Sequence, residues 1–179
     1  DRGEVVHPQP DPALHVEPHP VTRRGDIWIL DTSTGSTRAL IATPAEEILP
    51  RLSPDGRWIA YESDASGRFE VEIASVEFGA RLQVSTNGGT WPAWSANGRD
   101  LFYLHDGTIY RVPVDGSGSG SSSGISSTQP SAGNPVPVFH HPDIVLFRPA
   151  AAGGFVVVRR TGEHLPLTRL DLVLNWRAP

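Results

Sequence analysis

The sequence predicts an all-β fold made of repeated antiparallel units of four strands each. The 179 residues include 17 prolines and 18 glycines, a content that favours short strands joined by many turns over long helices. The chain also repeats itself, because residues 25–66 align without gaps with residues 67–108 at an offset of 42 residues. Short strands separated by turns fit this period better than helices do.

Residues 1–24 predict an extended arm. They hold five prolines and three histidines without hydrophobic periodicity, which is typical of polyproline-like or β conformation. Two interpretations stay open: a loose linker, or an arm that lies along a neighbouring molecule. His15 and His19 have the spacing of metal ligands, but no third ligand group accompanies them, so we predict no metal site.

The first repeat unit, residues 25–66, centres on a predicted hairpin. Its motif begins at Pro50, and its turn is formed by Ser53, Pro54, Asp55 and Gly56, in which proline fixes φ and glycine tolerates a positive φ. The residues from Trp58 to Tyr61 are nearly all apolar, as in a strand buried on both faces. We therefore expect this strand to lie centrally in a sheet.

The second unit, residues 67–108, repeats this pattern. Asn97 and Gly98 form a dipeptide favoured in tight turns, and an apolar run follows at 101–104. Residues 69–73 and 108–112 alternate as half-buried strands do. The motif residues of this unit, to which we assign turn formation and packing as in the first unit, are Pro92, Trp94, Ser95, Asn97, Gly98 and Tyr103.

Tryptophans and acidic pairs in these units favour structural interpretations. Tryptophans at repeat positions are expected to pack between strands, and they are Trp28, Trp58, Trp91, Trp94 and Trp176. The pairs Glu46/Glu47 and Glu70/Glu72 predict solvated faces, because nothing in the sequence places an acid opposite them. We therefore assign no catalytic residue.

Residues 109–179 predict a degraded terminal unit or units. A Ser/Gly-rich loop at 116–135 interrupts them with the composition of a flexible linker. Within it, residues 120–124 satisfy the G-x-S-x-G pattern of serine hydrolases, but the strand and helix that this motif needs on either side are not predicted. We interpret the match as a coincidence of low complexity.

The run S-P-D-G-R-W-I-A-Y at 53–61 and its weaker copy at 95–103 resemble the PD40 or WD40-like repeat of TolB-type β-propellers. The G-G-x-x-P-x-W-S pattern at 88–95 and the V-L-N-W sequence that ends in Asn175 and Trp176 resemble the last blades of a bacterial sensor-type propeller. The resemblance implies blades of four strands and a protein-binding or gating role. Two clear units and a degraded one predict an incomplete ring, since closed propellers generally need at least about four blades.

Composition excludes some partners. The formal charge of −5 and the lack of a Lys/Arg cluster argue against nucleic acid. No stretch reaches the roughly 18 apolar residues of a spanning helix. We predict no cofactor, and we expect the chain, which begins at Asp1 and lacks methionine, to be a processed product or part of something longer.

The function that we predict is that of a non-catalytic protein-binding or scaffold propeller module. One alternative is a self-assembling structural subunit of a fibre or ring, in which the arm at 1–24 pairs with the next copy and sheets are completed by strand exchange. Another is a gating or sensor propeller of a larger enzyme chain. The resemblance implies a location in the cell envelope or outside the cell.

Overall fold

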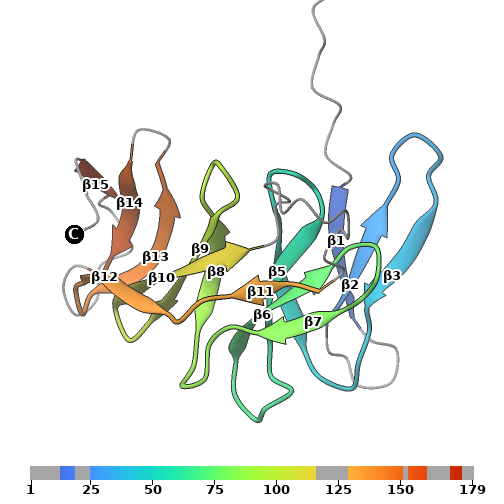
Figure 1. Ribbon diagram of the computed structural model, residues 1–179, viewed down its shortest axis with the longest axis horizontal. Coiled ribbons are helices and arrows are strands. Elements are labelled where there is room, and N and C mark those ends of the chain that lie inside the picture. The colour runs from blue at the N-terminus through green and yellow to red at the C-terminus, as the bar shows by residue number, and fades with distance from the viewer. Residues whose placement is uncertain (1–12, 19–24, 116–128, 151–152, 161–169, 175–179) are drawn as a thin grey trace, which may run out of the picture.

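The computed structural model describes residues 13–18, 25–115, 129–150, 153–160 and 170–174, and these form strands, turns and loops without a helix (Figure 1). All strand pairs are antiparallel, which confirms the predicted all-β class. In this part of the chain there is accordingly no helix long and apolar enough to cross a membrane.

The first two sheets follow each other in the chain. The first has the order β1 (Ala13–Pro18), β2 (Gly25–Leu30) and β3 (Thr37–Ile41). The second has four strands in the order β4 (Glu47–Leu52), β5 (Trp58–Ser63), β6 (Glu70–Ser75) and β7 (Arg81–Gln83). Part of the predicted arm, residues 13–18, thus pairs with β2 of its own chain.

The third and fourth sheets complete the described fold. The third runs through β8 (Thr90–Trp94), β9 (Asp100–His105) and β10 (Thr108–Asp115), and β10 also pairs with β11 (Ser131–Ala132) and β12 (Val136–His140). The fourth has the order β13 (Ile144–Pro149), β14 (Gly154–Arg159) and β15 (Leu170–Leu174). The predicted loop at 116–135 lies largely outside the described residues, as do residues 120–124.

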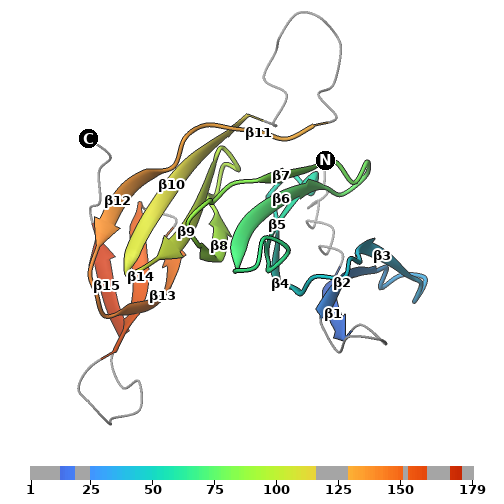
Figure 2. The ribbon, with the colours of Figure 1, turned by 90° about the horizontal axis from the view of Figure 1, so that it is seen from below.

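The sheets stand side by side in chain order, with the first and last at opposite ends of an arc (Figures 1 and 2). They converge on their first strands, since β8 contacts β4 on one side and β13 on the other. We call β4, β8 and β13 the inner strands. The arc does not close on itself, and the predicted incomplete ring of propeller sheets is confirmed for the described residues.

Three apolar clusters fill the spaces between neighbouring sheets. Ile27 and Ile59 belong to the cluster between the first and second sheets, and Ala60 and Leu101 to that between the second and third. Phe102 and Phe155 meet edge to face, with ring centroids 5.1 Å apart, between the third and fourth. Each inter-sheet space is therefore a small core of its own, as expected where one sheet cannot bury its faces alone.

The predicted hairpins are confirmed, and each of them has the same pattern of hydrogen bonds. Ser53 Oγ donates to Asp55 Oδ1 over 2.6 Å and accepts from the Trp58 N–H over 3.0 Å. In the second copy, Ser95 Oγ and Asn97 Oδ1 lie 2.8 Å apart, and Ser95 Oγ accepts from the Asp100 N–H over 3.0 Å. The serine thus closes the turn by bonding both to the side chain two residues on and to the backbone five residues on.

The strands after these turns lie where the sequence placed them. Every residue of β5 is buried, as are residues 101–104 of β9, and both strands are interior to their sheets. The last sheet keeps a reduced hairpin, in which the Gly153 N–H donates to Ala150 O. Ala150 stands where the other copies have serine, so the side-chain part of the network is lost there.

The 42-residue period and the sheets are out of phase. The unit 25–66 contains the last two strands of the first sheet and the first two of the second. The outer turns also correspond at a different offset, because Gly35 donates to Asp31 O and Gly79 to Ser75 O, positions that are 44 residues apart. The gapless alignment is therefore right around the inner turns and two residues out of register in the outer strands, where the intervening loops differ in length.

Candidate binding site on the inner strands

Two inner strands carry the same irregularity at the same repeat position. The pairing of β4 with β5 shifts between Ile48 and Arg51, and that of β8 with β9 shifts between Thr90 and Ala93. Within these bulges Leu49 has a φ of 52° and Trp91 a φ of 57°, and each precedes a motif proline, Pro50 or Pro92. Left-handed backbone in a bulky residue is strained, and bulges of this kind redirect side chains.

A carboxylate of the neighbouring sheet holds one bulge in place. The Trp91 N–H donates to Glu62 Oε1 over 2.6 Å, across the space between the third and second sheets. Burial raises the pKa of Glu62 above its ordinary value, although the bond from Trp91 and the charge of Arg51 act in the opposite direction. Glu62, with a relative exposure of 3%, is therefore a buried anchor for a strained backbone.

Arginines occupy equivalent positions on two inner strands. Arg51 precedes Ser53 by two residues, and Arg148 precedes Ala150 by two, while Ala93 holds the same place in β8. Each guanidinium folds back on its own strand: Arg51 Nη1 donates to Pro50 O over 2.8 Å and Arg148 Nη1 to Phe147 O over 3.2 Å. Burial, and after it the positive charge of Arg148, lowers the pKa of Arg51 below its ordinary value, while the charge of Glu62 acts in the opposite direction.

A further bond ties the inner strands together. Trp94 Nε1 donates to Arg51 O over 2.9 Å, so a side chain of β8 is hydrogen-bonded to the backbone of β4. Trp94 also packs against the cluster between these two sheets. The arrangement holds Arg51, Glu62 and Trp91 on rigid elements, as a binding site requires.

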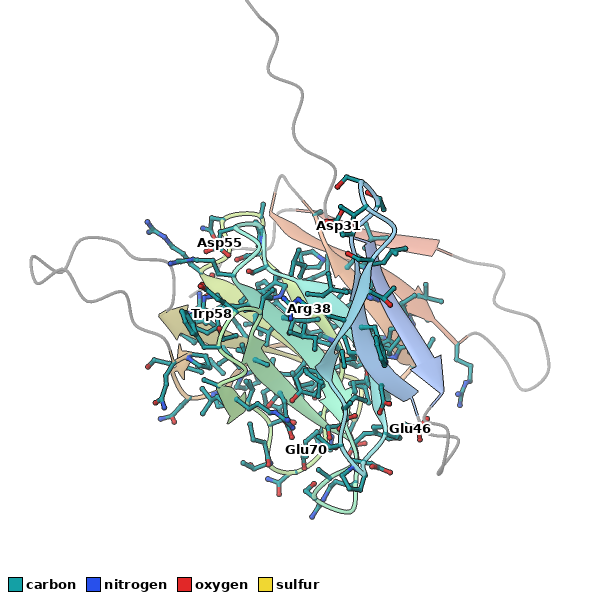
Figure 3. All side chains as sticks on the ribbon, turned by 90° about the vertical axis from the view of Figure 1, so that its right-hand side faces the viewer. Asp31, Arg38, Glu46, Asp55, Trp58 and Glu70 are labelled. Carbon is teal, nitrogen blue, oxygen red and sulfur yellow. The ribbon has the colours of Figure 1, made fainter. Side chains whose placement is uncertain are left out.

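The prediction that both acidic pairs lie on solvated faces is wrong for one member of each pair. Glu47 and Glu70 are 1% and 2% exposed, whereas a solvated face was expected for both. Glu70 accepts hydrogen bonds from Ser85 Oγ and, over 2.9 Å, from the Gly88 N–H, and it lies at the end of the second sheet opposite Asp55 (Figure 3). Burial raises the pKa of Glu47, whose Oε1 accepts from Thr43 Oγ1. Glu70 tolerates burial because it accepts hydrogen bonds from donors in a later loop, which strand periodicity does not reveal.

The remaining motif residues have structural roles. Trp58, Tyr61 and Tyr103 are buried, as predicted for packing residues, and Tyr61 also donates through its hydroxyl to Glu72 Oε2 over 2.5 Å. Tyr103 stacks on Tyr110 with ring centroids 5.1 Å apart. Asn175 and Trp176 lie outside the described residues. In the described ranges, no group of three or more His, Asp or Glu side chains is arranged to hold a metal ion.

Sequence reasoning did not single out Arg51, Glu62 or Arg148. The signal for Arg51 and Arg148 is their shared distance from the hairpin turn, which requires aligning the last sheet on Gly153. Glu62 has no counterpart signal, because its place in the repeat is taken by Leu104 in the next unit. Only the packing of one sheet on the next reveals its bond to Trp91.

Comparison with solved structures agrees with this geometry. TolB from Acinetobacter baumannii superposes with a TM-score of 0.61 at 18% identity, over 84% of this chain and 35% of that one. The chain has a TolB-like β-propeller fold. Putative TolB from Agrobacterium tumefaciens gives a TM-score of 0.52 at 17% identity, over 72% of this chain and 45% of that one.

Peptidase chains contain similar regions. A structure of prolyl endopeptidases superposes on the TolB-like sheets with a TM-score of 0.53 at 14% identity, over 89% of this chain and 27% of that one. Tricorn protease homolog 1 of Streptomyces coelicolor is 31% identical over 99 residues, which are 50% of this chain and 9% of that protein. No family model matches the sequence. The chain thus spans less than half the length of each of these relatives.

Proposed function

We propose that this chain is a non-catalytic protein-binding module that holds its partner on the inner strands. The observation that carries the proposal is the pair of strained bulges at equivalent positions, with Leu49 and Trp91 in left-handed conformation and the second bulge anchored by Glu62. Strain of this kind persists where the surrounding structure enforces it, and it concentrates at sites that contact ligands. The likeness to TolB and peptidase propellers supports a binding role by analogy of fold.

The proposal is tested with peptides selected from a random library on the immobilised chain and then titrated by calorimetry. We expect selected peptides to bind and to be recovered uncleaved by mass spectrometry. Trp91→Asn, which accepts the left-handed backbone but lacks the indole, should weaken binding at least about tenfold. Phe78→Asn is the matched control, because Phe78 is an exposed aromatic residue, 59% accessible, in the turn between β6 and β7.

Two results would overturn this function. If no peptide binds, or if peptides bind equally to the Trp91→Asn variant, the inner strands are not the binding surface. If the peptides are cleaved by the purified chain, the module is not free of catalysis.

We also propose a location in the cell envelope, which the resemblance to TolB-type propellers implies. Fractionation of the producing cells with an antibody to the chain checks it, and recovery in the cytosol would contradict it.

Self-assembly is a second candidate, favoured by the outer face of the last sheet. Val156 pairs with Arg148 there, and the corresponding residues Ala60 and Phe102 are buried by the next sheet at 0% and 5% exposure. Val156 and Val158 are only half-buried, since no described sheet follows. A sheet of a second copy would cover this apolar face. The arm is not required for it, because its residues 13–18 pair within their own chain.

Light scattering across a concentration series separates the two candidates. A monomer at all concentrations would overturn self-assembly, while a dimer or polymer that dissociates on Val156→Glu would support it. A gating or sensor role within a larger enzyme chain stays a prediction. It is checked on the full-length protein, in which a catalytic domain would have to be joined to these sheets.

A further inference from the structure

A cleft lies between two neighbouring turns at one end of the second sheet. Residues 56–58, where the β4–β5 turn meets β5, and residues 75–78, where β6 meets the β6–β7 turn, line the cleft, and its volume is about 150 Å³. A methyl group added to Gly56 would meet no atom within 4 Å, which agrees with open space on that side. A cavity of this size can hold one small apolar ring.

The cleft presents an exposed aromatic ring and a hydrogen-bond donor without an acceptor. Phe78 is 59% exposed, the more exposed of the two large apolar side chains that lie open to solvent in the described ranges. Trp58 is 4% exposed, and its buried Nε1 has no hydrogen-bond partner among the described residues. An indole N–H can only donate, and a buried donor without an acceptor costs free energy. A fitting ligand therefore supplies an apolar ring and a carbonyl oxygen.

A proline-rich segment supplies both of these groups. Its rings are apolar, its carbonyls are not used by internal hydrogen bonds, and aromatic-lined grooves recognise such segments. The sequence contains H-P-Q-P-D-P at residues 7–12, which lie outside the described ranges. Every residue in it is a proline or precedes one, so its backbone is restricted to extended conformations. Binding such a segment costs little conformational entropy.

The first sheet connects the start of β1 with the cleft. Leu14 pairs with Ile29, and Ile29 pairs with Arg38, so the three residues form one row across β1, β2 and β3. Arg38 Nη2 donates to the carbonyl oxygen of Val76, a lining residue of the cleft, over 3.1 Å. The row spans two strand spacings, roughly 10 Å. The start of β1 is therefore separated from the cleft by this distance and one arginine side chain.

The direction of β1 is also suitable. Ala13 pairs with Leu30, next to the turn at Asp31, and Asp31 and Asp55 lie at the same end of the molecule (Figure 3). The chain before Ala13 thus joins β1 at the end where Gly56 and the cleft lie. The twelve residues before Ala13 span up to roughly 37 Å in a polyproline helix, which is ample for this separation.

We propose that residues 7–12 bind in this cleft of their own chain, with a proline ring against Phe78 and a backbone carbonyl that accepts from Trp58 Nε1. The pairing of β1 keeps the segment close to the cleft, and a short tether gives it a high effective concentration there. The arm is then neither a loose linker nor bound to a neighbouring molecule. This inference does not rest on the proposed binding function, because the cleft does not include the strained bulges at Leu49 and Trp91.

A nitroxide spin label on the arm of the full chain tests the proposal. The chain contains no cysteine, so Gln9→Cys provides a single labelling site. In the ¹⁵N-labelled chain, we expect the label to cause a loss of amide signal at residues 56–58 and 75–78. Residues 64–68, in the loop at the other end of the sheet, should keep their signals. When spin-labelled chains without ¹⁵N are mixed with ¹⁵N-labelled chains without a spin label, no loss is expected.

Variants decide whether the cleft and the prolines are responsible. Phe78→Asn should abolish the loss of signal at residues 56–58, and its exposed position allows the variant to fold. Val136→Asn is the matched control, because Val136 is also an exposed apolar residue, 43% accessible, on β12. Replacing the prolines at positions 8, 10 and 12 by alanine should weaken the effect, because it removes the backbone restriction.

The proposal is wrong if the spin label causes no selective loss at residues 56–58 and 75–78, or if Phe78→Asn leaves that loss unchanged. A loss of signal in the mixed sample would assign the segment to a second copy of the chain and would likewise overturn binding within one chain. Neither result bears on the inner strands, where peptide binding is measured with Trp91→Asn. Phe78→Asn releases the arm and leaves those strands intact, so the two proposals fail independently.

Discussion

The backbone N–H of Trp91 and the side chain of Glu62 join two sheets at a strained bulge, through a hydrogen bond of 2.6 Å. Trp91 belongs to the inner strand β8, and Glu62 belongs to β5, the second strand of the preceding sheet. One buried carboxylate therefore fixes both the spacing of the sheets and the conformation of a residue on the candidate binding surface.

Removing this acceptor should destabilise the fold. Glu62→Leu leaves the Trp91 N–H without its partner, and we expect a loss of about 1–3 kcal/mol in the free energy of unfolding. Glu62→Gln keeps an oxygen at the same place and should lose less. Urea denaturation followed by tryptophan fluorescence measures both variants. Equal stability of Glu62→Leu and the natural chain would show that the bond does not hold the bulge.

The raised pKa of Glu62 predicts a pH dependence with a defined sign. Between its ordinary value of 4.5 and its raised value in the fold, the folded chain binds more protons than the unfolded chain. Glu62 therefore contributes less to stability as pH rises through this window, whereas glutamine does not titrate. The stability of Glu62→Gln relative to the natural chain should increase from pH 4 to pH 7. Urea midpoints at several pH values test this, and a decrease would contradict it.

The two hairpin copies predict different tolerance at Asp55. Burial alone would raise its pKa, but hydrogen bonds from Ser53 and Arg57 and the charge of Arg57 outweigh burial and lower it. Asp55→Asn recreates the arrangement of Asn97 and should cost less than about 1 kcal/mol, whereas Asp55→Ala loses the turn bonds and should cost about 1–2 kcal/mol. Thermal melts of both variants, with Asn97→Ala as the control in the other copy, provide the check. Equal melting temperatures would refute the role of the side chain.

Glycines with positive φ should differ in how they accept alanine. Gly56 has a φ of +72° and open space where a methyl group would be added, so Gly56→Ala should cost roughly 1–2 kcal/mol from backbone strain alone. Gly107 has a φ of +68°, and an added Cβ would lie 2.5 Å from His141 O. Gly107→Ala should therefore cost clearly more in chemical denaturation. A smaller loss at Gly107 than at Gly56 would mean that the loop before β13 moves away freely.

The hairpins and central strands were predictable because their signals are local. Ser53 with Asp55, and Ser95 with Asn97, specify the turn within five residues, and the apolar run from Trp58 to Tyr61 specifies a buried strand. The internal repeat of 42 residues predicted that several similar sheets follow one another, as in a propeller. Local signals therefore established the fold class before any contact was known.

The phase of the sheets and the inner-strand site were not predictable in the same way. A repeat has the same length wherever the boundary between its units is drawn. Its length therefore does not show that residues 25–41 complete an earlier sheet. The burial of Glu47, Glu62 and Glu70 depends on partners up to 29 residues away in the chain, such as Trp91. The left-handed conformation of Leu49 is also imposed by pairing and not by residue type.

The central claim, that the inner strands form a protein-binding surface, is tested most directly by nuclear magnetic resonance of the ¹⁵N-labelled chain titrated with a library-selected peptide. The account predicts that amide shifts concentrate at residues 48–51, 90–94 and 144–148, on β4, β8 and β13. Shifts confined to the outer strands β3 and β7, or to the turns at Gly56 and Gly98, would contradict it.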